Sequence, residues 1–208
     1  MKVLSVQIPA PCLLDCVFCR TPDHNKGNPA RVLRTVNAHL NNRPNGYKEV
    51  YLTSNGETGL STIFGEMLEI ARKNSLGVAV LCATEHSVVP GLCRVEVSLN
   101  PYTEPLAIKA IAKAKRLGIP TVISMVDTGT PINPDGVAKQ YKVDGVLVRS
   151  LQVEGKSHKK TGSTRYFSRL RAKLGHFPVA AYRELLGLGF KTTCIDHEGN
   201  TVALLGLG

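Results

Sequence analysis

Residues 3–20 read VLSVQIPAPCLLDCVFCR, a short strand-like run followed at once by three cysteines. Apolar and polar residues alternate over Val3–Ile8, which predicts a half-buried strand. Two prolines end the run, so we interpret it as the first strand of a fold and not as a signal peptide. The cysteines then lie on a loop at the carboxyl end of this strand, where α/β folds usually place their sites.

A strand–helix alternation continues along the chain. Short apolar runs predict five further strands, and periodic segments between them predict helices. Nearly apolar strands that alternate with helices favour a parallel sheet with covered faces. Six such units are too few for a complete eight-fold barrel, so the predicted fold is α/β, a partial (β/α)6 barrel of parallel strands. The strands are expected at Val3–Ile8, Glu49–Thr53, Gly77–Ala83, Arg94–Leu99, Thr121–Met125 and Gly145–Leu151, and the helices at Pro29–Asn42, Ser61–Asn74, Pro105–Leu117 and Val137–Tyr141.

The end of the chain has a different pattern. Pro178–Leu188 predicts a final helix, and Lys191–Asp196 with Thr201–Leu205 predicts a β-hairpin around a Gly-Asn turn. We therefore expect a barrel core over residues 1–155. Residues 156–208 are expected to be an extension of the same domain, with a C-terminal helix and a β-hairpin.

Composition restricts the class of protein. The 208 residues carry a formal net charge of +10, which favours an anionic partner such as nucleic acid or a phosphorylated substrate. No stretch is long and apolar enough to span a membrane, so we expect a cytoplasmic protein with no membrane partner. The composition leaves the oligomeric state open.

The three clustered cysteines predict a metal site. Cys12, Cys16 and Cys19 place three thiolates on one tight loop, and thiolate is the soft ligand that iron–sulfur clusters use. Three protein ligands would leave one iron of a cubane open, as a catalytic metal site requires. The alternative is a structural zinc site, for which His24 is a candidate fourth ligand. No second Cys-x2-Cys pair accompanies it.

A Cys-x3-Cys-x2-Cys loop after a first strand, with an aromatic residue directly before the third cysteine, resembles the signature of the radical S-adenosylmethionine superfamily. The resemblance implies that Cys12, Cys16 and Cys19 hold a [4Fe–4S] cluster whose open iron chelates the methionine part of S-adenosylmethionine. The reduced cluster would then cleave this cofactor to a 5′-deoxyadenosyl radical that abstracts hydrogen from a substrate. The resemblance also implies an electron donor of the flavodoxin or ferredoxin type, and it places Phe18 beside the adenine.

The turn after the second predicted strand reads Asn55-Gly56-Glu57. A glycine there lets the backbone approach a ligand closely, and a carboxylate can accept hydrogen bonds from an ammonium group. The resembled family carries a Gly-Gly-Glu motif at this point, which binds the methionine amine. Asn55 replaces the first glycine, and asparagine tolerates left-handed backbone geometry best after glycine. We therefore expect Asn55, Gly56 and Glu57 to bind the methionine end of the cofactor.

Polar residues also end the later predicted strands. By the same resemblance, Ser98 and Asn100 are expected to contact the cofactor. Ser124, Asp127 and Arg149 are expected to face the same mouth of the barrel. Arg149 would require an anionic partner there, so it joins the expected cofactor-binding residues.

Three cysteines remain outside the loop, and some members of the resembled family hold an auxiliary cluster. Cys82 and Cys194 lie in predicted strands, where cysteine behaves as a small hydrophobic residue. The sequence leaves a metal role for these two and for Cys93 open.

The substrate is not identified by the sequence. Family members of similar length include activating enzymes of glycyl-radical enzymes and a deazapurine-forming synthase, and other members modify RNA. The competing function is a zinc- or cluster-stabilised nucleic-acid-binding protein without catalysis.

Lys156–Lys173 contains seven lysine or arginine residues and no acidic residue, with Tyr166 and Phe167 between them. This composition is typical of a surface that binds a phosphate backbone and stacks bases on aromatic rings. A solvated surface and a lid over an anionic substrate are the alternatives.

We expect Lys156–Lys173 to bind an anionic substrate, that is a nucleotide, a phosphorylated metabolite or an RNA. The triple variant K159A/K160A/R165A should raise the apparent KM for the true substrate and leave unproductive cofactor cleavage intact. Binding through phosphates should also weaken steeply with salt, because counterions are released. Steady-state kinetics over a salt series measure both effects. Normal turnover by the triple variant at low salt would show that the segment is only a solvated surface.

Overall fold

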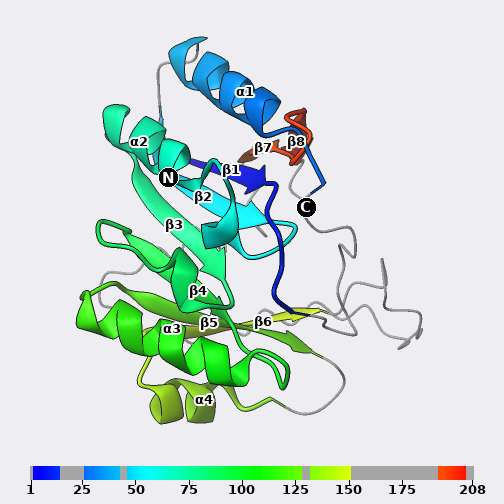
Figure 1. Ribbon diagram of the computed structural model, residues 1–208. Coiled ribbons are helices and arrows are strands. Elements are labelled where there is room, and N and C mark those ends of the chain that lie inside the picture. Colours follow the sequence, from blue (N-terminus) through cyan, green and yellow to red (C-terminus); the bar gives the residue numbers. More distant parts are fainter. Residues whose placement is uncertain (1, 15–25, 43–45, 128–131, 151–191, 205–208) are drawn as a thin grey trace.

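The computed structural model describes residues 2–14, 26–42, 46–127, 132–150 and 192–204. Eight strands in these ranges form one sheet (Figure 1). They are β1 (Lys2–Ile8), β2 (Tyr47–Ser54), β3 (Gly77–Cys82), β4 (Arg94–Ser98), β5 (Thr121–Asp127), β6 (Gly145–Ser150), β7 (Thr192–Ile195) and β8 (Thr201–Leu204).

The strand order is β6-β5-β4-β3-β2-β1-β7-β8. Every neighbouring pair from β6 through β7 is parallel, and β8 pairs with β7 in the antiparallel direction. The predicted α/β fold, a partial barrel built on six parallel strands, is confirmed and takes the form of an open sheet. All six predicted strands of the core are present, with ends within a few residues of those expected.

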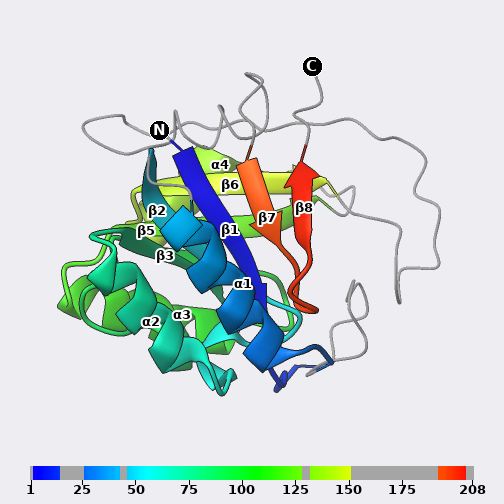
Figure 2. The same ribbon diagram turned by 90° about the horizontal axis from the view of Figure 1, so that it is seen from above.

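Helices connect these strands, and the three longer ones lie along one side of the sheet (Figure 2). The predicted helix Pro29–Asn42 is confirmed at both ends. Each of the other three predicted helices begins and ends within three residues of its expected bounds. In the described ranges the helices are α1 (Pro29–Asn42), α2 (Phe64–Lys73), α3 (Glu104–Arg116) and α4 (Pro134–Tyr141), with the short 3-10 helices η1 (Thr58–Leu60) and η2 (Glu85–Ser87).

The hydrophobic core lies between the helices and the facing side of the sheet. Alternate residues of each strand point to this side, and they pack with the inner faces of α1, α2 and α3. The inner face of α3 is largely alanine, which allows the helix to approach the sheet closely. Full burial of each large aliphatic side chain contributes about 1.5–3 kcal/mol. Fully buried core residues include Leu4, Val6, Val36, Leu52, Met67, Val80, Val97, Ala110 and Ile123.

The opposite side of the sheet carries buried polar residues from β2 and β4. Arg94 Nη2 donates to Glu49 Oε1 at 2.7 Å, and the Tyr51 hydroxyl donates to Glu96 Oε2 at 2.9 Å. The Arg94 guanidinium also lies 5.9 Å from the centre of the Tyr51 ring. Burial raises the pKa of Glu49, and the charge of Arg94 acts in the opposite direction. Loss of either side chain would therefore leave the other charge buried and unpaired.

The predicted C-terminal hairpin is confirmed. Its two strands, β7 and β8, pair in antiparallel register from Thr192↔Leu204 to Ile195↔Thr201. Its place in the sheet was not predicted: β7 lies parallel to β1 and extends the sheet beyond the first strand. Pro178–Leu188 and Lys156–Lys173 lie outside the described residues, and the boundary at residue 155 stays a prediction. None of the helices that the structure describes has the length and apolarity needed to cross a membrane.

Replacing Arg94 with methionine should lower the free energy of unfolding by about 3–5 kcal/mol, because it leaves the buried Glu49 carboxylate without its partner. Urea denaturation of the metal-free protein measures this loss. The matched control is R72A, which removes the exposed Arg72–Glu69 pair of α2 and should cost far less. Equal stability of R94M and the wild type would show that the pair contributes little to folding.

Candidate functional site

The carboxyl ends of the parallel strands meet at one edge of the sheet, and the predicted site residues follow these ends. Ile8 pairs with Ser54 at the ends of β1 and β2, so the cysteine loop and the turn after β2 begin side by side. Ser98 of β4 pairs with Ser124 of β5 at the same edge. Cys16, Phe18 and Cys19 lie outside the described residues, and the structure describes only the backbone of Asp127 and Arg149.

The turn after β2 packs directly against the backbone that leaves β1. Glu57 N donates a hydrogen bond to Pro11 O at 2.8 Å. A Cβ atom at Gly56 would overlap the carbonyl groups of Ala10 and Pro11, so only glycine fits at this position. Cys12, which is half-buried, comes directly after this contact. The structure therefore brings the first cysteine and the Asn-Gly-Glu turn together.

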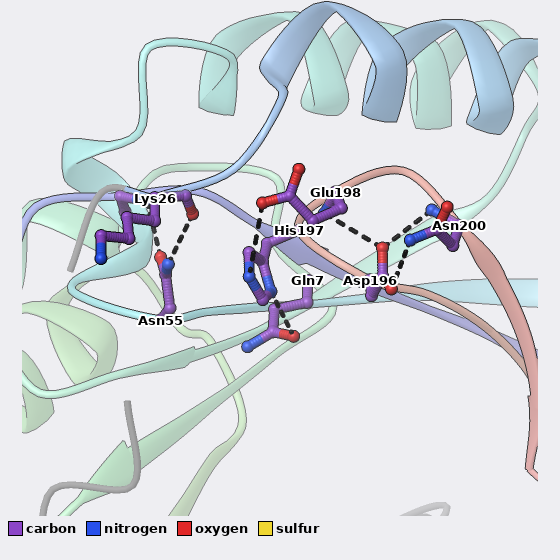
Figure 3. Close-up of polar contacts among 8 residues, drawn as sticks. Gln7, Lys26, Asn55, Asp196, His197, Glu198 and Asn200 are labelled. Carbon is purple, nitrogen blue, oxygen red and sulfur yellow. Dashed lines mark hydrogen bonds and ion pairs between the residues drawn. The ribbon is translucent and has the colours of Figure 1, made fainter. Parts of the chain in front are cut away.

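Asn55 is buried at the base of the cysteine loop, with 3% of its surface exposed. Its Oδ1 accepts a hydrogen bond from Ala10 N at 3.0 Å, and its Nδ2 donates to Lys26 O at 2.7 Å (Figure 3). Asn55 does not use the left-handed backbone geometry that asparagine tolerates. In the described part of the chain, the non-glycine residues with positive φ are Ser75 and Lys142.

The carboxylate of Glu57 is buried and points toward the segment after β3. It accepts hydrogen bonds from Ala83 N at 2.9 Å and from the Ser87 hydroxyl. Burial raises the pKa of Glu57, while the hydrogen bonds from Ser87, Ala83 and Thr84 act to lower it. A carboxylate has about four lone-pair positions, so a cofactor ammonium would share this group with the protein donors. The sequence analysis did not predict these donors, although Thr84 and Ser87 lie in the segment that follows the end of β3.

The polar residues at the end of β4 form the turn that leads into α3. Asn100 Oδ1 accepts hydrogen bonds from Tyr102 N at 2.9 Å and from Thr103 N at 3.1 Å. The Thr103 hydroxyl in turn donates to Ser98 O at 2.8 Å. Asn100 therefore stabilises the turn that precedes α3, which is a common structural use of asparagine. The contacts to a cofactor expected for Ser98 and Asn100 stay predictions.

Cys82 and Cys93 lie at opposite ends of neighbouring parallel strands, since Cys82 ends β3 and Cys93 precedes β4. Burial raises the pKa of the Cys82 thiol well above its usual value, and the Glu57 and Glu96 carboxylates raise it further. Burial and the nearby Glu49 carboxylate raise the pKa of Cys93 to about 12. Cys82 and Cys93 are thus held apart by the length of these strands, and a metal role for either one stays open. The side chain of Cys194 is not described.

The β7–β8 turn forms a second support at the same edge, which sequence reasoning missed. His197 O accepts a hydrogen bond from Asn28 N at 2.9 Å, just beyond the cysteine loop. The His197 ring lies with Nδ1 3.3 Å from Gln7 Oε1 of β1 (Figure 3). The Thr35 hydroxyl of α1 donates to Gly199 O at 2.9 Å. The hairpin turn thus holds the segment that leads from the cysteine loop into α1.

Comparison with solved structures identifies the same fold in SuiB from Streptococcus suis. The structure of SuiB bound to precursor peptide SuiA matches 73% of this chain and 39% of its own, with a TM-score of 0.56 and 14% identity. SuiB bound to S-adenosylmethionine matches 72% of this chain and 39% of its own, with a TM-score of 0.54 and 14% identity. This chain thus spans well under half the length of SuiB. SuiB thus shares the α/β fold expected for this chain, and one of its structures has S-adenosylmethionine bound.

A structure of TYW1 with a lysine-pyruvate adduct bound aligns with 99% of this chain and 80% of its own, at 16% identity and a TM-score of 0.45. That score is too low to establish a shared fold. No protein-family profile and no curated protein sequence matches the chain.

Adding a methyl group at Gly56 should disrupt the contact between the two strand ends. G56A should lower the free energy of unfolding by about 1–3 kcal/mol, because the new Cβ meets backbone that cannot move aside easily. The matched control is G65A in α2, where a Cβ meets nothing within 4 Å. G65A should be as stable as the wild type or up to about 1 kcal/mol more stable, because alanine favours helix. Urea denaturation measures the free energy of unfolding of both variants. A G56A variant as stable as the wild type would contradict the close packing of Gly56 against Ala10 and Pro11.

Proposed function

We propose that this chain is a radical S-adenosylmethionine enzyme that reductively cleaves S-adenosylmethionine at a [4Fe–4S] cluster and uses the resulting radical to abstract hydrogen from a substrate. Cys12, Cys16 and Cys19 would hold the cluster. One observation carries the proposal: Cys12 and the Gly56 turn meet at the carboxyl edge of a sheet. SuiB, which shares this fold, has been seen with S-adenosylmethionine bound.

The residues present fit the cluster. Three cysteines lie within eight positions, and thiolates are the ligands that an iron–sulfur cluster takes. Cys12 leaves β1 on backbone held by Glu57 N and Asn55 Oδ1, which fixes the position of the first ligand. When bound, the cluster would supply the electron that splits the sulfonium of the cofactor, and the protein would supply orientation and exclusion of water.

The turn after β2 is the part of the chain proposed to bind the methionine end of the cofactor. Glycine at position 56 lets this turn pack against the backbone of Ala10 and Pro11, which brings the turn beside Cys12. The Glu57 carboxylate is already oriented by Ala83 and Ser87, so little conformational freedom is lost when it accepts a further bond. Such a contact to an ammonium is charge-assisted and therefore stronger than a neutral one.

Other strand ends would complete the cofactor site. Phe18 is proposed to lie beside the adenine, and Ser98 and Asn100 to contact the rest of the cofactor. Ser98 lies next to the buried Ser124 across the β4–β5 pair, so hydroxyl groups gather at this edge. Arg149 is proposed to pair with an anionic group of the cofactor or substrate, because a guanidinium near a low-dielectric site requires such a partner.

The net charge of +10 supports an anionic substrate, such as a nucleotide or RNA. The same net charge also suits binding of an electron donor of the flavodoxin or ferredoxin type, which we propose supplies single electrons. SuiB has been seen with a precursor peptide, so a peptide is the second substrate class to test.

Anaerobic reconstitution with iron and sulfide tests the proposal. We expect brown protein with a [4Fe–4S] cluster that, once reduced, converts S-adenosylmethionine to 5′-deoxyadenosine and methionine. C12A, C16A and C19A should each lose the cluster, because each removes one thiolate ligand. C93A is the matched control and should keep it, since Cys93 precedes β4 at the amino end of the strands, away from Cys12. Colourless protein with stoichiometric zinc and no cofactor cleavage would reject the proposal in favour of a zinc-stabilised binding protein.

A further inference from the structure

We propose that Asn55 is a positioning residue of the cysteine loop: its carboxamide ties Ala10, which precedes Cys12, to Lys26, which follows Cys19. The inference rests on the proposed function, because it makes Asn55 a determinant of how the loop holds the cluster. It concerns the side chain of Asn55, at a position where the resembled family carries glycine. The bridge is therefore a feature of this chain's own sequence.

The two contacts of the bridge are well formed. The distances of 3.0 Å from Ala10 N to Oδ1 and 2.7 Å from Nδ2 to Lys26 O are typical of strong hydrogen bonds. Asn55 and Ala10 are both buried, so water cannot easily replace the contact between them. Lys26 is exposed and is the outer anchor of the bridge. Removal of the side chain would leave the buried Ala10 amide without this acceptor, which is more costly than the loss of an exposed bond.

The asparagine side chain carries both of the groups that this bridge needs. A carboxamide offers both an acceptor oxygen and a donor nitrogen, and the bridge uses one of each. Aspartate would keep the acceptor for Ala10 N but would set a carboxylate oxygen against Lys26 O. Glycine would lose both contacts. N55D therefore breaks one half of the bridge, and N55G breaks the whole of it.

The bridge acts on both ends of the cysteine loop at once. Residues 11–25 lie between its two anchors, so fixing the anchors removes conformational freedom that would otherwise be lost when the metal binds. Two backbone contacts hold the same ends separately: Glu57 N bonds Pro11 O, and Asn28 N bonds His197 O. Asn55 joins the two ends to each other, which neither of these contacts does.

Hydrogen exchange on the metal-free full chain tests the bridge itself. In N55G the Ala10 amide should exchange about tenfold faster, because it loses its acceptor. In N55D the same amide should stay protected. N74D is the matched control, because the exposed Asn74 carboxamide also donates to a backbone carbonyl, that of Ile70. Wild-type exchange of the Ala10 amide in N55G would overturn the proposal.

Iron release to a chelator from the reconstituted chain tests the positioning. N55G and N55D should both release iron about 10- to 100-fold faster than the wild type, as is usual when a residue that supports metal ligands is removed. The electron paramagnetic resonance spectrum of the reduced cluster should change in both. N55D is nearly isosteric and keeps the test open if N55G fails to fold.

The R94M variant distinguishes a loss of positioning from a general loss of stability. R94M breaks an ion pair at the opposite edge of the sheet, so it should keep the wild-type spectrum and release rate. Equal release from R94M and the Asn55 variants, or wild-type release from the Asn55 variants, would show that Asn55 does not position the loop. If the wild type itself binds no iron, the proposed function fails, and the Ala10 exchange still decides whether the bridge exists.

Discussion

The contact between the end of β1 and the turn after β2 is the constraint on which the candidate site depends. The two strands pair in register up to Ile8 and Ser54, and adjacent strands lie about 4.8 Å apart. Both chains must therefore turn within a narrow space, and position 56 has no room for a Cβ. A shift of one residue in this register would turn every side chain of β1 to the other face and move Cys12 away from the turn.

The same turn connects the first two strands to the third. Glu57 bonds Ala83 N, Thr58 Oγ1 donates to Leu81 O at 2.6 Å, and Gly59 N donates to Ser87 Oγ at 2.6 Å. These bonds join three consecutive strand ends through short polar side chains. The buried carboxylate is retained among several donors, because an unpaired charge in this position would be too costly. The edge of the sheet is thus stabilised by hydrogen bonds, and its middle by apolar packing.

Local patterns predicted most of the fold, because strands and helices leave a periodicity in nearby residues. The core strands, α1 and the terminal hairpin all follow from such patterns. The parallel pairing of β7 with β1 does not, since the Gln7–His197 contact joins residues 190 positions apart. The role of Asn55 was missed for the same reason: its partner Ala10 is 45 positions away, and the backbone argument for asparagine had no bearing on its side chain. The motif located the turn, but only the fold shows which way Glu57 points.

The two faces of the sheet differ in a way that bears on the substrate. The helix-covered face is apolar, whereas the other face buries Glu49, Glu96 and Arg94 in β2 and β4. Arg94 is already paired with Glu49, so these side chains offer no free positive charge. The positive charge for the anionic substrate that we propose would therefore come from elsewhere in the chain. Arg149 and the seven basic residues of Lys156–Lys173 follow next in the sequence, with no acidic residue in that basic stretch.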